Sequence, residues 1–300
     1  MIYTVTFNPA WDYVVYVNNM RIDTVNRASS ERLVFGGKGI NVSAVLKELG
    51  QESIILGFIA GFTGNALEKE LKSKGFKTDF IKLTHGMTRI NVKINSDSET
   101  EINGQGPGID DGAIKELFDK MNNLNNGDTL VLSGSVPKTV SENIYERILK
   151  IVSNKHIRIV VDAEKNLLIN ALKYKPFLVK PNIHELGEIF GVELSNNDEI
   201  KAYAKKLKQM GAENVLVSMG KDGAILIDSQ GNCIKVDSAK GEMINSVGAG
   251  DSMIAGFLAE YEKSEDYCRA LKLATAAGGA TAFSHGLASK DKIYEVLKTI

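Results

Sequence analysis

The chain has 300 residues, a length that suits either one large α/β domain or two smaller ones. Hydrophobic residues make up 43% and charged residues 24%, so the composition predicts a folded protein with a sizeable core. The net charge of -1 provides no long-range field that would attract nucleic acid or an anionic membrane. We therefore expect neither partner, and local cations and backbone dipoles must hold any anionic ligand.

The metal-binding residue types are scattered. Cys233 and Cys268 lie far apart, and the four histidines do not cluster at ligand spacing, which argues against a zinc site. Residues 1–7 have no basic start and no long apolar run, so they predict a strand and not a signal peptide. No stretch approaches the ~20 apolar residues that cross a bilayer. These features predict reduced thiols and a cytoplasmic location.

The first predicted strand leads into Asn8-Pro9-Ala10-Trp11-Asp12. Asp12 could accept hydrogen bonds from sugar hydroxyls, and a simple turn aspartate is the alternative. The next turn, Phe35-Gly36-Gly37-Lys38-Gly39, opens a predicted helix that runs through Leu49. Its glycines would let the backbone approach a ligand closely, with Lys38 projecting toward it. A plain tight turn into a helix is the alternative.

Two segments carry strand patterns without a helix directly after them. They are Asp12 to Val17 and Arg89 to Ile102, both with polar or glycine interruptions. They predict a small separate sheet, inserted near 11–35 and 86–104 into a single domain that spans 1–300. Such a sheet could form a lid over a site, or it could be an ordinary edge hairpin.

The middle and C-terminal parts alternate apolar runs with amphipathic stretches. The apolar runs are continuous, as expected for strands buried on both faces; they are 129–134, 158–162, 177–181 and 214–218. Glu142 to Val152 and Glu199 to Met210 carry apolar residues at helical spacing. This repetition predicts a mostly parallel sheet covered on both faces, with ligands beyond the carboxyl ends of its strands.

Lys180-Pro181-Asn182-Ile183-His184-Glu185 lies at a predicted strand-to-helix junction. Asn182 and Glu185 are three residues apart, so their oxygens can face the same side. That arrangement suits Mg²⁺ held largely through waters. A helix cap with its capping-box glutamate is the alternative.

The strongest signal is Ser246-Val247-Gly248-Ala249-Gly250-Asp251-Ser252, directly before a predicted helix. Free N–H groups and the positive end of a helix dipole meet there, and such a spot binds phosphate or developing negative charge. A carboxylate would be repelled from a phosphate, unless Asp251 takes a proton from an attacking hydroxyl. A first-turn acid or N-cap is the alternative.

Common nucleotide signatures are missing. The chain has no Gly-x-x-x-x-Gly-Lys-[Ser/Thr], which excludes a Walker A enzyme, and no protein-kinase pair of His-Arg-Asp and Asp-Phe-Gly. Gly37-Lys38-Gly39-Ile40-Asn41-Val42 lacks the third glycine of the dinucleotide fingerprint.

Taken together, the glycine turns at 36–39 and 247–251 resemble the two signatures of the ribokinase-like (PfkB) sugar kinases, and the resemblance runs essentially end to end. Asn8 to Val15 and Glu99 to Pro107 are most similar to bacterial 1-phosphofructokinases, with tagatose-6-phosphate kinases next. Ser246, Lys138-Thr139 and His285-Gly286 depart from common forms. The resemblance implies a three-layer α/β/α fold with a mostly parallel central sheet and a small β-sheet lid.

The resemblance also implies site roles. Asp251 would be the base, and the amides of Gly248, Ala249 and Gly250 would stabilise charge on the transferring phosphoryl group. Asn182 and Glu185 would orient Mg²⁺ through water. The residues implied for the sugar phosphate are Asp12, Arg27, Gly37, Lys38, Asn41, Arg89 and Ser135. Those implied for ATP are Lys180, Ser218, Gly220, Gly248 and Gly250.

The implied reaction is ATP-dependent phosphorylation of D-fructose 1-phosphate at its 6-hydroxyl, which gives fructose 1,6-bisphosphate. Tagatose 6-phosphate or fructose 6-phosphate as acceptor stays open within the family. Outside it, a nicotinamide-dependent oxidoreductase that uses Gly36 to Gly39, or a non-catalytic sugar-phosphate sensor, stays open. The resemblance also implies a homodimer formed through the lid.

Overall fold

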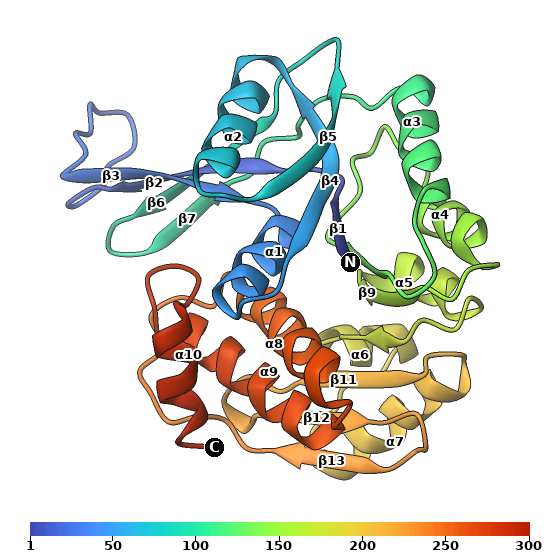
Figure 1. Cartoon of the computed structure of the whole chain (residues 1–300). Helices are drawn as coiled ribbons and strands as arrows, with labels where there is room; N and C mark the ends of the chain where they lie inside the picture. Colours follow the sequence, from blue (N-terminus) through green and yellow to red (C-terminus); the bar gives the residue numbers. More distant parts are fainter.

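The computed structural model describes residues 1–300 and contains a nine-stranded sheet and a separate four-stranded sheet (Figure 1). The large sheet has the order β13-β12-β11-β10-β9-β8-β1-β4-β5. Its pairs are parallel from β5 to β11, and only β12 and β13 pair antiparallel. The strands are β1 Ile2–Thr6, β4 Ser53–Ala60, β5 Lys77–Leu83, β8 Thr129–Ser133, β9 Arg158–Asp162, β10 Leu178–Val179, β11 Asn214–Ser218, β12 Ala224–Ile227 and β13 Cys233–Val236.

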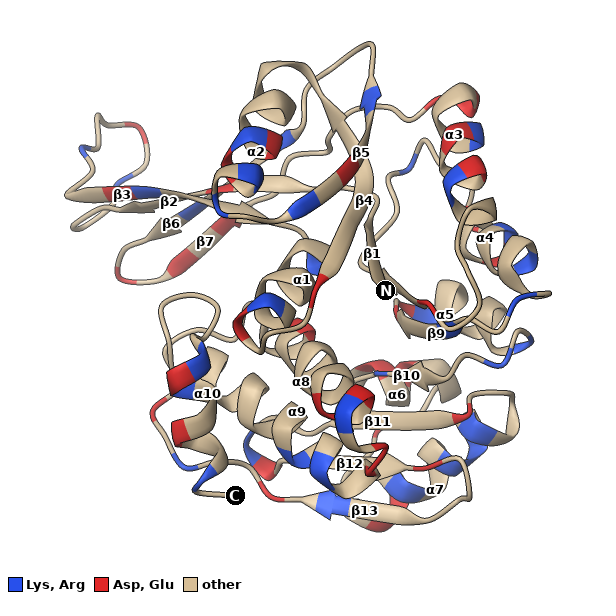
Figure 2. Cartoon of the chain, viewed as in Figure 1, with Lys and Arg blue, Asp and Glu red and all other residues tan.

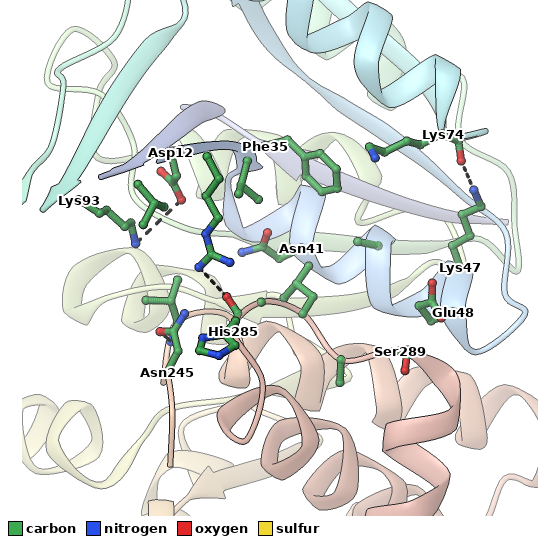
Figure 3. Close-up of a pocket in the computed structure, with 18 of the residues that line it drawn as sticks. Asp12, Phe35, Asn41, Lys47, Glu48, Lys74, Lys93, Asn245, His285 and Ser289 are labelled. Carbon is green, nitrogen blue, oxygen red and sulfur yellow. Dashed lines mark hydrogen bonds and ion pairs between the residues drawn. The ribbon is translucent and has the colours of Figure 1, made fainter. Parts of the chain in front are cut away.

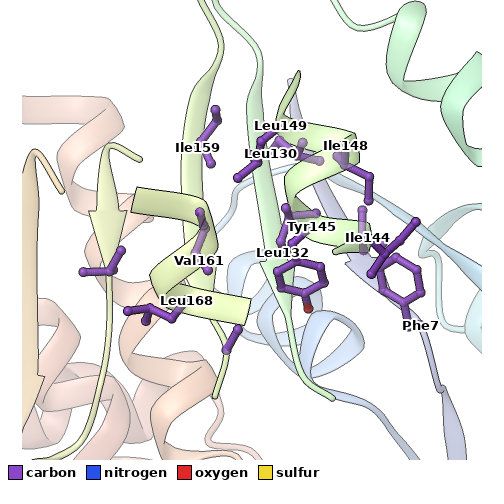
Figure 4. Packing of buried hydrophobic residues seen from close by; sticks show 14 of the residues in the cluster. Phe7, Leu130, Leu132, Ile144, Tyr145, Ile148, Leu149, Ile159, Val161 and Leu168 are labelled. Carbon is purple, nitrogen blue, oxygen red and sulfur yellow. The ribbon is translucent and has the colours of Figure 1, made fainter. Parts of the chain in front are cut away.

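Helices cover both faces of this sheet, which gives the predicted three layers. The helices are α1 Lys38–Glu48, α2 Gly61–Ser73, α3 Asp111–Asn122, α4 Ile144–Val152, α5 Lys165–Leu172, α6 Ile183–Phe190, α7 Asn197–Gln209, α8 Ala249–Ser264, α9 Tyr267–Ala282 and α10 Lys290–Leu297. Successive residues of a strand point to opposite faces, so Leu130 and Leu132 join one core and Val131 the other. Figure 4 shows Leu130 and Leu132 beside the apolar side of α4, and Val161 beside Leu168 of α5.

The second sheet is the one predicted from the two inserted segments. Its strands are β2 Ala10–Tyr16, β3 Ser30–Gly36, β6 Arg89–Asn95 and β7 Glu99–Ile102, in the order β3-β2-β6-β7. β2 pairs parallel with β6 and antiparallel with β3, which places Asp12 opposite Val34 and Asn91. The sheet projects from one side of the main body beside α2 and above α10 (Figure 1). We refer to these four strands as the lid.

Several predicted boundaries shift. The segment Arg89 to Ile102 is a hairpin and not one strand. The run at 177–181 forms a regular strand only at Leu178 and Val179, although Lys180 still donates to the Val161 carbonyl at 3.3 Å and the Pro181 carbonyl still accepts from the Ser218 amide at 3.1 Å. The helix predicted from Glu142 begins at Ile144, and the one predicted from Glu199 begins at Asn197 behind the Asn196 cap.

Charge is distributed evenly over the molecule. Lys and Arg alternate with Asp and Glu along most outer helices (Figure 2), in agreement with the net charge of -1. None of the helices combines the length and the apolarity that a membrane crossing requires.

Candidate active site

The two predicted glycine turns meet at the carboxyl edge of the large sheet. Gly37 caps the N-terminus of α1 with φ 121°, and Gly248 caps α8 with φ 80°. Both values lie where glycine is favoured, so each turn needs its glycine. Asn41 Nδ2 donates a hydrogen bond to Asp251 Oδ2 at 2.9 Å. The early and the late turn therefore face each other across one cleft.

A cavity of about 610 Å³ opens at this junction. It is lined by residues from several strand ends and helix starts, among them Lys38, Asp162, Lys180, Asn182, Glu185, Ser218, Gly220, Gly248, Ala249, Gly250 and Asp251. These include all the residues implied for the phosphoryl group, ATP and Mg²⁺. Ligands of parallel α/β sheets bind at this edge, and the carboxyl ends of β9, β10 and β11 supply much of the lining.

Asp251 lies in the first turn of α8 and is 5% exposed. Burial raises the pKa of this carboxyl to about 6, and the negative charge of Asp162 adds to the rise. The hydrogen bond from Asn41 and the positive charges of Lys38 and Lys180 oppose it. The carboxylate is therefore ionised at neutral pH yet much more basic than an ordinary aspartate, as a general base requires.

The start of α8 offers free donors to an anion. The amides of Gly248 and Gly250 make no hydrogen bond within the protein, since the first intrahelical bond is donated by Ser252 to the carbonyl of Gly248. The Ala249 amide donates to the carbonyl of Ser246 at 3.2 Å. Two of the three amides implied for the anion hole are thus available, whereas the third is already engaged.

Asp162, at the end of β9, was not among the predicted site residues. It is 2% exposed, and each of its oxygens meets a different lysine: Oδ1 lies 3.2 Å from Lys180 Nζ, and Oδ2 lies 3.2 Å from Lys38 Nζ. Burial alone would raise the pKa of Asp162, but the two ammonium groups outweigh it and hold the pKa below its ordinary value. Its place at the carboxyl end of a predicted buried strand was the one signal in the sequence.

Helix α9 lines the same cavity with Thr275, Gly278 and Phe283 just beyond its end. No sequence motif marked these residues. A Cβ atom at Gly278 would lie 2.5 Å from Met253 Cγ, so this glycine lets α9 approach α8 closely. The α9 wall of this cavity was therefore not predicted by the glycine turns.

Asn182 and Glu185 form the helix cap that was one of the two interpretations of this pair. Asn182 Oδ1 accepts from the Glu185 amide, and Glu185 Oε2 accepts from the Asn182 amide, both at 2.8 Å. They form a capping box at the start of α6. Each carboxyl or amide group also lines the cavity. The cap thus fixes the direction of both side chains without excluding the metal role.

A second cavity, of about 560 Å³, lies between the inner face of the lid, α1 and the loop at 285–289 (Figure 3). Asp12 and Asn41 line it. Asn91 Nδ2 donates to Asp12 Oδ1 at 2.8 Å, and a Cβ atom at Gly36 would lie 2.8 Å from Asp12 Oδ2. The glycine turn therefore makes room for the Asp12 carboxylate. Asn41 borders this cavity while it bonds to Asp251 of the first one.

Four residues implied for the sugar phosphate, Arg27, Gly37, Arg89 and Ser135, line neither cavity. Arg27 is exposed in the connection between β2 and β3, and Ser135 is exposed after β8. Arg89 is half-buried, and its Nε donates to the Asn8 carbonyl at 3.1 Å. Lys38 faces the first cavity and pairs with Asp162. Arg89 nevertheless lies on the strand that pairs with the strand of Asp12, close enough for the two charges to interact, whereas Arg27 and Ser135 border neither cavity.

The chain is similar to known proteins over nearly its whole length. The chain is 42% identical over 300 residues to 1-phosphofructokinase of Bacillus subtilis, covering 100% of this chain and 98% of the relative. It is 38% identical over 301 residues to D-tagatose-1-phosphate kinase of Bacillus licheniformis, with 100% and 98% covered.

Among solved structures, phosphofructokinase-2 from Escherichia coli in complex with substrates and products superposes with a TM-score of 0.92 at 26% identity. That match covers 99% of this chain and 98% of the other. The family model for pfkB carbohydrate kinases matches residues 5–293. The chain therefore belongs to the pfkB family of carbohydrate kinases.

Proposed function

We propose that this chain transfers the γ-phosphate of ATP to the 6-hydroxyl of D-fructose 1-phosphate and so produces fructose 1,6-bisphosphate. The observation that carries the proposal is the buried Asp251 carboxylate, which stands beside the free amides of Gly248 and Gly250 at the start of α8. A base and an anion hole at one helix mouth are what phosphoryl transfer to an alcohol requires. The names of the relatives at 42% and 38% identity support a ketohexose phosphate as the acceptor.

In this mechanism, Asp251 accepts the proton of the attacking hydroxyl as the oxygen approaches phosphorus. The amides of Gly248 and Gly250 donate to oxygens of the transferring group, where negative charge develops. Lys180 lies next to Gly250, since a Cβ atom at Gly250 would be 3.0 Å from Lys180 Nζ. Its positive charge would stabilise the same group, together with that of Lys38.

Asn182 and Glu185 would hold Mg²⁺, and the residues present fit that ion. The capping box uses Asn182 Oδ1 and Glu185 Oε2, so the second carboxylate oxygen of Glu185 makes no hydrogen bond within the protein. No group of three His, Cys, Asp or Glu side chains converges anywhere in the chain, which suits an ion held mainly through its waters. When bound, the ion would neutralise charge on the phosphates.

The sugar phosphate would lie between the lid and α1, with Asp12, Gly37 and Asn41 at its hydroxyls. Lys38, Arg27, Arg89 and Ser135 are retained as candidates for its phosphate. Arg89 and Asp12 already lie on neighbouring strands of the lid, so further closure would be needed only for Ser135 to approach them, and closure would also exclude water from the reaction. Lys180, Ser218 and Gly220 would hold ATP at the other end of the cleft.

Assembly and location are further parts of the proposal. The lid exposes Leu33 and Ile102 by 54% and 58%, and an apolar sheet surface of this kind is suited to a second lid in a homodimer. Light scattering of the Leu33→Glu variant should then report a smaller mass than that of the unaltered protein. Both cysteines are free, which suits the reducing cytoplasm.

The deciding experiment is a coupled ADP-release assay with Mg²⁺ and ATP. It compares fructose 1-phosphate, fructose 6-phosphate, tagatose 6-phosphate, tagatose 1-phosphate and ribose by kcat/KM. Fructose 1-phosphate should rank first; a higher value for another ketohexose phosphate would reassign the substrate within the family. Asp251→Asn should lose nearly all turnover, and retained turnover would refute the proposed base.

Two other functions give different outcomes in simple measurements. A sensor would bind the sugar phosphate in calorimetry but release no ADP. An oxidoreductase would bind NADH tightly and saturably in a fluorescence titration. The free anion hole and the buried base favour the kinase over both.

A further inference from the structure

Asp162 sits between the two cations of the cleft. It is the last residue of β9 and pairs in register with Ser133 of β8, so the sheet fixes its backbone. Lys38 reaches it from the first position of α1, and Lys180 reaches it from the segment after β10. Three separate elements therefore converge on one carboxylate.

Lys38 and Lys180 form ion pairs with Asp162 and not with Asp251. Both Nζ atoms lie 3.2 Å from an Asp162 oxygen. Neither lysine forms an ion pair with Asp251, whose one hydrogen-bond donor is Asn41. Asp251 interacts with the charges of both lysines, so removal of Asp162 would leave Asp251 as the anion available to both ammonium groups. An ion-paired Asp251 would be a weaker base, since its lone pairs would be engaged.

Packing around the lysines supports a fixed position for each. Gly134 has φ 97°, and a Cβ atom there would lie 3.6 Å from Lys38 Cβ, so the Lys38 stem packs against this turn. Lys180 is 5% exposed, and its Nζ lies beside Gly250. The ammonium that Asp162 holds is thus adjacent to an amide of the anion hole.

We propose that Asp162 is a positioning residue: it holds the ammonium groups of Lys38 and Lys180 beside the anion hole and keeps them off the Asp251 carboxylate. This inference rests on the proposed function for its meaning in catalysis. The geometric part of the inference is that Asp162 keeps the Asp251 carboxylate free of ion pairs. That part can be tested without measuring enzyme turnover.

Several charged groups face Asp251. They are Asp162 from β9, Lys38 from α1 and Lys180 from the segment after β10; Glu185 of α6 acts on Lys38. On α8 itself, Asp251 is the one acid in the first turn. Asp162 raises the pKa of Asp251, and the lysines lower it. Asp162→Asn should therefore lower that pKa, both through the lost negative charge and through the released ammonium groups.

The test is a ¹³C NMR titration of aspartate-labelled, ligand-free protein, in which Asp251→Asn identifies the Asp251 carboxyl signal. In the unaltered protein we expect a midpoint near 6. In Asp162→Asn it should fall by about one unit or more, and in Lys180→Met it should rise. A midpoint that stays unchanged in folded Asp162→Asn would overturn the inference. So would a shift in the same direction for both variants, because a general structural disturbance has no reason to follow the sign of the removed charge.

The matched control is Asp128→Asn. Asp128 is also a buried aspartate, directly before β8, and it pairs with the N-terminal ammonium of Met1 at 3.0 Å, outside both cavities. This variant should lose stability but leave the Asp251 titration unchanged. A shifted titration would mean that any buried carboxylate has the same effect, which would also overturn the inference.

Kinetics test the positioning itself. Asp162→Asn should lower kcat and raise KM for Mg-ATP, since Lys180 loses its fixed place. If that variant does not fold, Asp162→Glu retains the charge but moves both ammonium groups. It should keep the Asp251 midpoint near 6 while kcat falls; an unchanged kcat would refute positioning. If the unaltered protein does not phosphorylate any of the sugar phosphates, the proposed function is refuted. The titration result would still be valid in that case.

Discussion

Asn41 and Asp251 are 210 residues apart in sequence, yet Asn41 Nδ2 lies 2.9 Å from Asp251 Oδ2. This bond joins the first turn of α1 to the first turn of α8. It orients one oxygen of the proposed base and leaves the rest of the carboxyl group toward the cleft. The same asparagine lines the cavity beneath the lid, so it connects the predicted sugar side with the base.

Asn41→Ala should lower kcat and move the acidic limb of the kcat/KM profile upward from about 6. The bond from Asn41 favours the charged carboxylate, and a hydrogen bond to a charged group contributes roughly 1.5–3 kcal/mol, which corresponds to a shift of about one pH unit or more. Ser43→Ala is the control on the same helix, because Ser43 bonds to Thr4 and Ser53 away from the cleft. If the acidic limb of Asn41→Ala stays near 6, the hydrogen bond from Asn41 does not control the pKa of the Asp251 carboxyl.

Asp251→Asn should be more stable than the unaltered protein at pH 7. The folded-state pKa of about 6 lies above the ordinary value of 3.8, so the folded state binds the proton more tightly than the unfolded chain. The unaltered protein therefore gains stability as pH falls through 6, and the gain is complete below 3.8. The asparagine variant lacks this dependence and avoids a buried charge, an advantage of up to about 3 kcal/mol at neutral pH.

Thermal unfolding at pH 7.5 and pH 4.5 measures this advantage. The melting temperature of Asp251→Asn should exceed that of the unaltered protein by several degrees at the higher pH, and the two values should converge at the lower pH. Asp128→Asn should be less stable at the higher pH, since it leaves the Met1 ammonium without its partner. Equal melting temperatures of Asp251→Asn and unaltered protein at pH 7.5 would contradict the raised pKa of the buried Asp251 carboxyl.

The sequence predicted most of the fold because its signals are local. Continuous apolar runs at 129–134 and 158–162 correspond to β8 and β9, and the interrupted segments became the lid. Asp162 escaped prediction because its role depends on two lysines that arrive from distant parts of the chain. A single aspartate at a strand end carries no spacing that reveals such partners. The engaged Ala249 amide was equally hidden, since it depends on the conformation of the preceding turn.

The substrate side shows the same limit. A resemblance transfers residue identities, but whether Arg27 and Ser135 border a cavity depends on the positions of the lid and of loops, which local patterns do not give. The two interpretations of Asn182 and Glu185 do not exclude each other. The pair forms the capping box, and it also lines the cavity. Pattern alone could not decide between a cap and a metal site because one geometry serves both.

Glu185→Gln separates these two roles. The glutamine carbonyl oxygen can still accept from the Asn182 amide, so α6 keeps its cap and the melting temperature should change little. The negative charge is lost, so the Mg²⁺ concentration for half-maximal activity should rise about tenfold or more. Glu199→Gln is a matched control, because Glu199 accepts from the Ser195 amide at the start of α7, outside both cavities. An unchanged Mg²⁺ requirement in Glu185→Gln would leave Glu185 with the cap alone.

Gly248→Ala tests the anion hole through its backbone. Gly248 has φ 80°, a conformation that costs an alanine about 1 kcal/mol or more, and its Cβ atom would lie 2.6 Å from Leu287 Cδ2. The turn must therefore shift, and its free amide moves with it. Gly286→Ala is the control from the neighbouring loop, since a Cβ atom there meets nothing within 4 Å.

We expect Gly248→Ala to lower kcat by about 100-fold, the usual effect of removing one oxyanion donor, with a smaller change in KM for the sugar phosphate. A donor that acts mainly on the transition state affects kcat more than ground-state binding. Gly286→Ala should retain the kcat of the unaltered protein. If Gly248→Ala raised only KM, or if both variants lost kcat equally, the turn at 248 would serve to shape the loop and not to stabilise the transferring phosphoryl group.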